Sequence, residues 1–402
     1  MDKREQYIDK KIIEKIMELR KQLHRIPEHS MHEVKTKQML MDFLKLHTAL
    51  EIVDCGAWFY AVKRADDRVT TENDKTFYVS KVDTERPEQM AEYKHPIAFR
   101  ADMDAVCGKD GKPGHFCGHD GHSSVLCGLG LYLDSGKEPL AQDVYLIFQP
   151  AEEIGKGAEL CRSLIKEKHI GEIYGFHNIP GKPLGTVLVK DGTFACASTG
   201  LEIHMTGTPS HAAYPEAGRN PGYALAGLLL QIEELTEHFN ETRGFVRMTL
   251  IGMELGSENY GVAASDGYLR LTVRSEGEQV FHDYLAEIRK LAEVMAQKED
   301  LELSIKEIER FPSTDNHAEQ VQKLRACAAS HQIPYIELPE PMRWSEDFGW
   351  YLQETKGAFF GIGDGEDYAQ LHTEHFEFPD AILETAVTMF AGLCVDIKEG
   401  EC

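Results

Sequence analysis

From residue 97 onwards the sequence alternates between short apolar runs and loops or helix-like segments. The runs IAFRA from residue 97, DVYLIFQ from 143 and EIYGFH from 172 have the length and composition of buried strands. Such alternation is typical of a parallel or mixed α/β sheet with helices on both faces. Ligands of these sheets bind where strands end and loops begin. Polar residues at those positions are therefore the functional candidates.

The flanking segments extend this pattern. Apolar residues at helical spacing predict one helix over residues 8–24 and a second over 34–44, separated by the turn RIPEHS. Further strands are predicted at EIVD from 51, AWFYAV from 57 and TFYVSKV from 76, and the region 62–96 is otherwise long and polar. After residue 318 the pattern predicts a helix over 318–331, strands at IPYIEL and AFFGIG, and a closing helix over 379–397.

Between residues 197 and 308 the order of predicted elements changes. The predicted elements are a strand at 199–207, a helix at 219–239, strands at GFVRMTLIGM and GYLRLTVRS, a helix from 280 and a strand at LELSIKEI. This β-α-β-β-α-β order is that of a split βαβ, ferredoxin-like unit of independent domain size. We therefore predict an α+β domain, 197–308, inserted into a discontinuous mixed-sheet α/β domain formed by 1–196 and 309–402.

Charge and hydropathy exclude several classes of partner. The formal net charge is -24, and the acidic residues are spread along the chain, which argues against nucleic acid or an anionic membrane as the partner. No apolar run has the length of a membrane span, and MDKREQYIDKKIIEK lacks an apolar signal core. The nine scattered cysteines include no C-x-x-C pair and do not describe a disulfide framework. We expect a cytoplasmic protein with reduced thiols.

The stretch HFCGHDGH, residues 115–122, places Cys117 and His119 in a glycine-containing loop before a helix-like run. A thiolate and an imidazole at this spacing can bind one transition-metal ion. Alone, the pair also fits a packed thiol near a surface histidine. Three further potential ligands, Glu153, His177 and His372, come from other loops. Four of the five lie beside predicted strand ends, and two cations sharing a thiolate would need about this many ligands.

Glu152 and Glu153 are adjacent in the sequence, so their side chains leave the strand end in opposite directions. If one binds metal, the other can face the substrate and act as a general base for hydrolysis. A solvated acidic pair at a helix N-terminus is the alternative interpretation, since negative charge is favoured there.

Seven ordered motifs together resemble the M20 family of metallopeptidases. They are RADMDAV, HFCGHDGH, FQPAEE, GFHNIP, GTPSHAAYP, SEDF and LHTEHFEFPD, and the N-terminal LHRIPEHSMHEVKT is also similar. The resemblance covers essentially the whole chain. It is greatest to the amidohydrolase branch that cleaves N-acyl amino acids, hippurate-like compounds and auxin conjugates. The resemblance implies a zinc-peptidase-like catalytic domain and an inserted lid and dimerisation domain.

The resemblance also implies roles for individual residues. Cys117 matches the ligand that bridges two metals, His119 and His177 match the ligands of one ion, and Glu153 and His372 match those of the other. Glu152 matches the general base. Asp104 matches a carboxylate that orients the site from behind.

Two residues of the insert complete the implied machinery. His211, in PSHAAYP, matches a histidine that stabilises the tetrahedral oxyanion, often from the partner subunit of a homodimer. Arg274 stands where relatives have an arginine and is a candidate for binding a substrate carboxylate. The implied reaction is hydrolysis of a linear amide C–N bond in an N-acyl amino acid, with two divalent ions per subunit. Zn, Mn, Co and Ni all suit the mixed sulfur, nitrogen and oxygen ligands.

Other readings stay open at this point. An M20-type dipeptidase or aminopeptidase would need a pocket for a free α-amino group, and the cysteine-containing loop favours the acyl-amino-acid branch. A metal-binding relative without turnover is opposed by the presence of Glu152. The linker CGKDGKPG is shorter than is usual in the branch, which bears on substrate choice because this loop forms part of the pocket wall.

Overall fold

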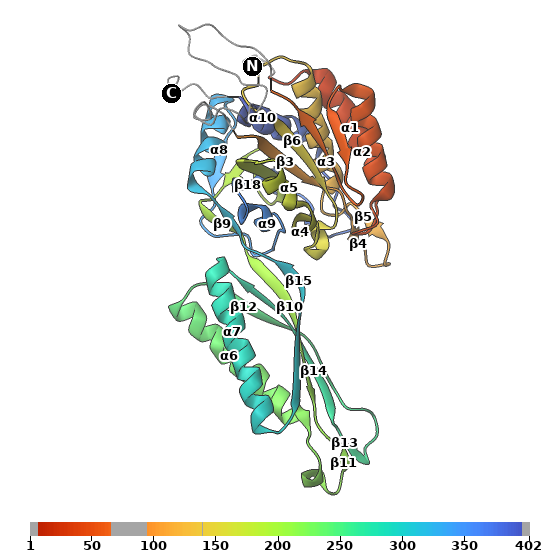
Figure 1. Ribbon diagram of the computed structural model, residues 1–402, viewed down its shortest axis with the longest axis vertical. Coiled ribbons are helices and arrows are strands. Elements are labelled where there is room, and N and C mark those ends of the chain that lie inside the picture. Colours follow the sequence, from red (N-terminus) through yellow and green to blue (C-terminus); the bar gives the residue numbers. More distant parts are fainter. Residues whose placement is uncertain (1–6, 66–94, 139, 396–402) are drawn as a thin grey trace, which may run out of the picture. The chain divides into compact units, whose positions relative to one another are not determined.

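The computed structural model describes residues 7–65, 95–138 and 140–395 (Figure 1). The predicted strand at 76–82 and most of the polar region 62–96 lie outside these ranges. The chain forms two compact units. The first takes in Met1–Phe194, Asp315–Glu340 and Asp347–Cys402, and the second Ala195–Thr314 and Pro341–Glu346.

An eight-stranded mixed sheet lies at the centre of the first unit, as the alternating sequence pattern predicts. Its strands are β1 (Glu51–Asp54), β2 (Phe59–Lys63), β3 (Ile97–Asp102), β6 (Val144–Gln149), β7 (Glu172–Pro180), β8 (Val187–Val189), β17 (Tyr335–Glu337) and β18 (Lys356–Gly365). The spatial order is β1-β2-β6-β3-β7-β18-β8-β17. The neighbours β6, β3, β7 and β18 are parallel, so their carboxyl ends meet at one edge of the sheet.

Helices cover both faces of this sheet. They are α1 (Lys10–His24), α2 (Val34–His47), α3 (His119–Asp134), α4 (Gly157–Cys161), α5 (Ser163–Glu167), α8 (Ala318–Ser330), α9 (Gly349–Leu352) and α10 (Leu383–Cys394). Consecutive strand residues point to opposite faces. Phe360 therefore packs against Phe390 of α10, whereas Phe359 packs against Phe348 beside α9. The predicted closing helix is shorter than expected, because Asp380–Ile382 forms a separate 3-10 turn before α10.

Two short strand pairs complete the elements near this sheet. The hairpin of β4 (Val106–Cys107) and β5 (Pro113–Gly114) lies between β3 and α3 in the chain, within the linker that the sequence marks as short. Strands β9 (Gly192–Ala195) and β16 (Thr314–Asn316) form a two-stranded sheet.

A four-stranded antiparallel sheet with two helices forms the second unit, in the predicted β-α-β-β-α-β order. Its elements are β10 (Ala197–Thr206), α6 (Pro221–Thr242), β12 (Val246–Leu255), β14 (Asp266–Ser275), α7 (Glu278–Lys298) and β15 (Glu302–Phe311), with the short strands β11 (Ser210–His211) and β13 (Val262–Ala263). The spatial order is β12-β14-β10-β15, which is that of a ferredoxin-like sheet. Alternate residues such as Leu201 and Leu271 are buried with Leu228 of α6 and Phe281 of α7.

The second unit is larger than the insert 197–308 expected from the sequence. Strand β15 continues to Phe311, which pairs with Ser198 of β10. Residues 341–346 join the unit because the Cys196 amide donates to the carbonyls of Met342 and Trp344. Both additions follow from hydrogen bonds between distant segments, which the local pattern does not encode.

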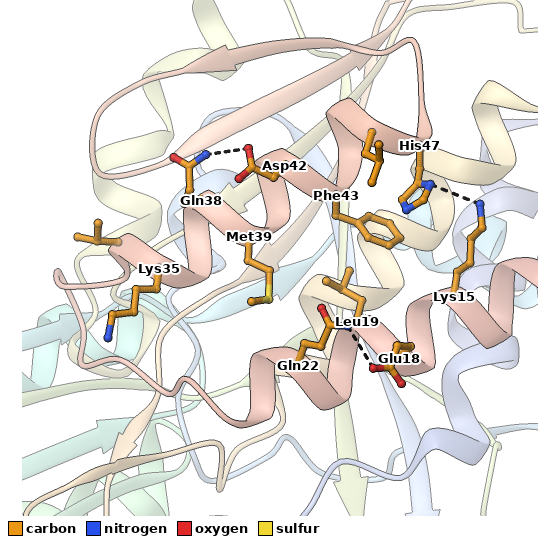
Figure 2. Close-up of a pocket in the computed structure, with 12 residues that line it drawn as sticks. Lys15, Glu18, Leu19, Gln22, Lys35, Gln38, Met39, Asp42, Phe43 and His47 are labelled. Carbon is orange, nitrogen blue, oxygen red and sulfur yellow. Dashed lines mark hydrogen bonds between the residues drawn. The ribbon is translucent and has the colours of Figure 1, made fainter.

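A groove of about 790 Å³ runs between α1 and α2, which lie side by side in Figure 1 (Figure 2). Leu19, Met39 and Phe43 line it, and a hydrogen bond joins Nζ of Lys15 to Nδ1 of His47 at its rim. None of the predicted site residues lines this groove. None of the helices in the described ranges has both the length and the apolar character needed to cross a bilayer.

Candidate metal centre

The parallel strands bring the predicted ligands to one edge of the first unit's sheet. Asp102 ends β3 and Asp104 follows it, while Glu152 and Glu153 follow β6. His177 lies in the second half of β7, where it pairs with Gly361 of β18. Cys117 and His372 belong to the loops before α3 and after β18. Neighbouring parallel strands thus gather residues that are far apart in the chain.

Cys117 is at the centre of this cluster. Its Sγ lies 3.3 Å from Nε2 of His177 and 3.3 Å from Nε2 of His372. The thiol is buried, whereas His372 is 53% exposed, so solvent reaches the cluster from the His372 side. One sulfur atom therefore faces two imidazoles from separate loops.

Two further ligand atoms have no hydrogen-bond partner. Nε2 of His119 and Oε1 of Glu153 are buried and unpaired within the described residues, although they lie 3.6 Å from each other. Oε1 of Glu153 is also 3.6 Å from Nε2 of His372. Buried polar atoms without partners are rare and require an explanation.

These distances fit bound cations. Two ligand atoms on one tetrahedral ion, each ~2.0–2.3 Å from the metal, are about 3.3–3.8 Å apart. The cluster contains one group of Cys117, His119 and His177, and another of Cys117, Glu153 and His372. The groups share Cys117, so the arrangement suits two ions joined by one thiolate. Mixed sulfur, nitrogen and oxygen donors are those of transition metals.

The electrostatics of the cluster also favour positive charge. The carboxylates of Asp102, Asp104 and Glu153 raise the pKa of His119 to about 10 despite its burial. Burial and the nearby Glu153 and Glu152 raise the pKa of the Cys117 thiol well above its usual range. A cation in the cluster would neutralise the carboxylates and stabilise the thiolate.

Local backbone geometry explains why these loops adopt this form. Gly118, between Cys117 and His119, has φ +103°, and a Cβ there would lie 2.4 Å from Oδ1 of Asn178. Only glycine fits such a left-handed, close approach. His372 also has a positive φ of 61°, and its amide donates to the carbonyl of Phe116 at 2.8 Å. The two loops that carry Cys117 and His372 are thus joined through their backbones.

Asp104 lies behind the ligands and contacts two of them. Its Oδ1 is 3.1 Å from Nδ1 of His119, and its Oδ2 accepts from the amide of Glu153 at 3.0 Å. The hydroxyl of Ser30 donates to Oδ2 at 2.7 Å. A carboxylate bonded to the second nitrogen of a histidine orients that ring and increases its basicity as a ligand.

The sequence interpretation gave no role to several buried polar residues behind the site. His122 lies one helical turn after His119, with Nδ1 2.7 Å from Asp102 and Nε2 2.8 Å from Oδ1 of Asn178. Asn178 in turn donates to Asp364 at 2.9 Å. The spacing of His119 and His122 on one helix was a signal that could have identified His122.

Arg100 was also missed, because a charged residue inside an apolar strand has no recognisable local pattern. Its guanidinium donates to Asp102, Gln149 and Asp347 at 2.8, 2.8 and 2.9 Å. Together with His119 and His122, this positive charge holds the pKa of Asp102 well below its ordinary value, although burial opposes the shift. Asp102 is therefore a fixed negative charge beside the ligands.

His211 and Arg274 lie in the second unit. His211 ends β11 and is exposed, and its Nδ1 accepts from the amide of Ala213 at 3.0 Å. Arg274 lies on β14 and donates to the hydroxyl of Ser345 at 2.8 Å. Their assignments to the oxyanion and to a substrate carboxylate stay predictions.

The fold and the ligand cluster define a mixed α/β protein with a candidate two-metal centre. Residues 98–396 match the model for peptidase family M20/M25/M40. This range is more than half of the chain, so the protein belongs to that family and is a hydrolase of it. The resemblance seen in the sequence motifs is thereby confirmed.

Individual relatives match over nearly their whole length. The chain is 27% identical to the N-acetyldiaminopimelate deacetylase of Bacillus subtilis over 397 residues, covering 94% of this chain and 98% of the relative. The fold is similar to that of the YXEP protein of Bacillus subtilis, described as a dinuclear metal binding peptidase, with TM-score 0.75, 24% identity, and coverage of 96% and 98%. An aminobenzoyl-glutamate utilization protein from Klebsiella pneumoniae has TM-score 0.69, 19% identity, and coverage of 96% and 98%.

Proposed function

We propose that this protein is a metal-dependent amidohydrolase that cleaves N-acyl amino acids into a carboxylic acid and an amino acid. The observation that carries the proposal is the pair of ligand groups that share Cys117, with the buried carboxylate of Glu152 beside them. In this proposal Cys117, His119 and His177 would hold one divalent ion, and Cys117, Glu153 and His372 would hold the other. When bound, the ions would polarise the amide carbonyl and make a water molecule more acidic.

Glu152 acts as the general base in this proposal. Its Oε2 lies 3.9 Å from Nε2 of His119, and its side chain is buried at the solvent-accessible cluster. The carboxylate takes a proton from the attacking water and delivers it to the amide nitrogen as the C–N bond breaks. Glu153, from the same turn, contacts His372 and is available as a ligand.

His211 donates a hydrogen bond to the oxyanion of the tetrahedral intermediate. Its Nδ1 accepts from the Ala213 amide, so the neutral ring carries its proton on Nε2. An exposed Nε2–H is the donor that such a role requires. Arg274 is proposed to bind the substrate carboxylate through guanidinium N–H groups other than those of Nη1, which donates to Ser345 and to the carbonyl of Arg343.

The N-acyl amino acid as substrate is supported by the deacetylase relative, whose name denotes removal of an acetyl group from an amino nitrogen. An N-acyl amino acid offers a neutral amide next to a carboxylate. The net charge of -24 opposes a large anionic partner such as nucleic acid.

The proposal includes a cytoplasmic homodimer that associates through the second unit. Within the described residues β12 pairs only with β14, which leaves its other edge open. The edge strand also exposes Leu250, Ile251, Met253 and Leu255. An open apolar edge is a surface that a second copy can cover. The nine scattered cysteines without a C-x-x-C pair, which do not describe a secreted disulfide framework, support a reducing compartment.

Metal content and turnover of the purified protein test the proposal together. Metal per chain is measured first, and then release of amino acid from N-acetyl, N-benzoyl and N-indoleacetyl amino acids and from dipeptides, with added Mn or Zn. Two bound ions with turnover of an acyl amino acid support the proposal. Turnover of dipeptides alone would instead favour the peptidase alternative. The absence of bound metal after reconstitution would overturn the proposal.

Glu152→Gln isolates the role of the base. The variant is expected to retain its metals and to lose about 10²–10⁴-fold in turnover, the usual contribution of general acid–base catalysis. Glu159→Gln, an exposed residue of α4, is the matched control and leaves both quantities unchanged. Undiminished turnover in Glu152→Gln would remove Glu152 from the mechanism.

A further inference from the structure

Ala151, the residue before Glu152, has a left-handed backbone conformation with φ 52° and ψ 39°. Residues with a Cβ adopt this conformation only where the surroundings hold them in it. Ala151 is fully buried, and its carbonyl accepts from the amides of Lys156 and Gly157 at 3.2 Å. The strained residue therefore sets the direction in which the chain leaves β6 and presents Glu152 and Glu153.

Glu33 holds this residue from another part of the chain. It lies at the N-terminus of α2, is 4% exposed, and its Oε1 accepts from the amide of Ala151 at 2.8 Å. The same oxygen accepts from the amide of Met31 at 2.9 Å. A buried carboxylate thus binds the backbone of a turn that carries a proposed base and a proposed ligand.

The turn is held by carboxylates on both sides of Glu152. Glu33 binds the amide before it, at Ala151, and Asp104 binds the amide after it, at Glu153. The segment that carries Glu33 also reaches Asp104 through the hydroxyl of Ser30. Removing the contact at Ala151 would leave Asp104 as the only one of these two carboxylates that holds the turn.

We propose that Glu33 is a positioning residue for the metal centre. Glu33 holds the backbone of Ala151 in its left-handed conformation, so that Glu153 can bind its cation and Glu152 can face the substrate. This inference rests on the proposed function for the roles of the two glutamates. Glu33 touches neither substrate nor metal and acts only through the backbone of the turn. This role requires an acceptor oxygen on residue 33 rather than a negative charge, because the amides of Met31 and Ala151 both donate to the same oxygen atom.

The test uses the full chain loaded with cobalt. Apparent Co affinity is measured by competition with a chelator, the visible absorption bands report ligand geometry, and thermal unfolding is recorded on the same samples. Glu33→Ala is expected to weaken Co binding roughly 10–100-fold, as loss of residues supporting a ligand does, and to shift the bands. Glu33→Gln retains one carbonyl oxygen for both amides and is expected to restore affinity and bands to those of the wild type.

Glu28→Ala is the matched control. Glu28 lies in the same segment, and its carboxylate also accepts two hydrogen bonds, from the amide and hydroxyl of Thr36. Its bond to the loop after β3 is made by its backbone carbonyl, which accepts from the amide of Ala105 and is retained in the alanine variant. It is expected to lower the unfolding temperature and to leave the Co bands unchanged. If Glu33→Ala does not fold, Glu33→Asp replaces it, because the shorter carboxylate withdraws the acceptor from Ala151.

Co affinity and absorption bands like those of the wild type in Glu33→Ala or Glu33→Asp would overturn the proposal. A loss of Co affinity in Glu28→Ala or Glu33→Gln as large as that in Glu33→Ala would also overturn it. Because Co binding needs no substrate, the result separates this inference from the proposed reaction. Weakened Co binding in Glu33→Ala, in a protein that hydrolyses nothing on the panel, would sustain the positioning role and refute the reaction.

Discussion

Cys117 and His372 are 255 residues apart in the chain, yet Sγ of the first lies 3.3 Å from Nε2 of the second. The contact exists because the loop after β18 bonds back to the loop before α3, where the His372 amide meets the Phe116 carbonyl. The same sulfur is 3.3 Å from His177. One thiol therefore joins two groups of candidate ligands, and its removal should affect both.

Cys117→Ala is expected to reduce bound metal from two ions per chain to one or fewer, because both ligand groups lose the atom that they share. Metal per chain after dialysis, measured by elemental analysis, checks this expectation. Cys127→Ala removes another buried thiol, from α3 and outside the cluster, and should retain the full metal content. Retention of two ions by Cys117→Ala would show that the thiol is not the shared ligand.

His211→Ala is expected to lower turnover roughly 10²–10³-fold, the usual effect of losing one oxyanion donor. Metal content should stay unchanged, because the residue lies on β11 of the second unit and the ligand cluster lies in the first. Turnover and metal are measured on one preparation, with the exposed His238→Ala as control. A parallel loss of metal would instead assign His211 to the ligand set.

Asp364→Asn is expected to change how stability depends on pH in the metal-free protein. Burial raises the pKa of Asp364 to about 7, and the hydrogen bond from Asn178 only partly opposes this. Between pH ~4 and about 7 the folded state therefore binds more protons than the unfolded state, so the stability contributed by this group falls as pH rises towards the folded pKa.

The size of that change follows from the shift. Between pH 5.5 and 8.5 the free energy of unfolding of the wild type should fall by about 2 kcal/mol more than that of Asp364→Asn, at ~1.4 kcal/mol per pKa unit. Urea unfolding at the two pH values measures it, and the exposed Asp367→Asn is the control. Identical pH profiles for Asp364→Asn and the wild type would mean that Asp364 titrates normally in the folded protein.

The parallel sheet and the second unit were predictable because burial determines the local spacing of apolar residues. IAFRA and VYLIFQ became the fully buried strands β3 and β6, and the insert formed its six main elements in the predicted order. The spacing of apolar residues depends on which face of a helix or strand is buried, so it can be recognised in the sequence. The five candidate ligands could be named because cysteine, histidine and glutamate are metal-binding residue types and four of the five lie beside predicted strand ends.

The sequence by itself thus determined the layers of the fold, the existence of an inserted unit and the chemical types available for a metal site. Only the tertiary structure decided how the site is held together. Glu33 and Ala151 are 118 residues apart, and His122 and Asn178 are 56 apart. A hydrogen bond between such positions needs one acceptor and one donor and imposes no periodicity on either segment. These contacts therefore appear only when the chain is folded.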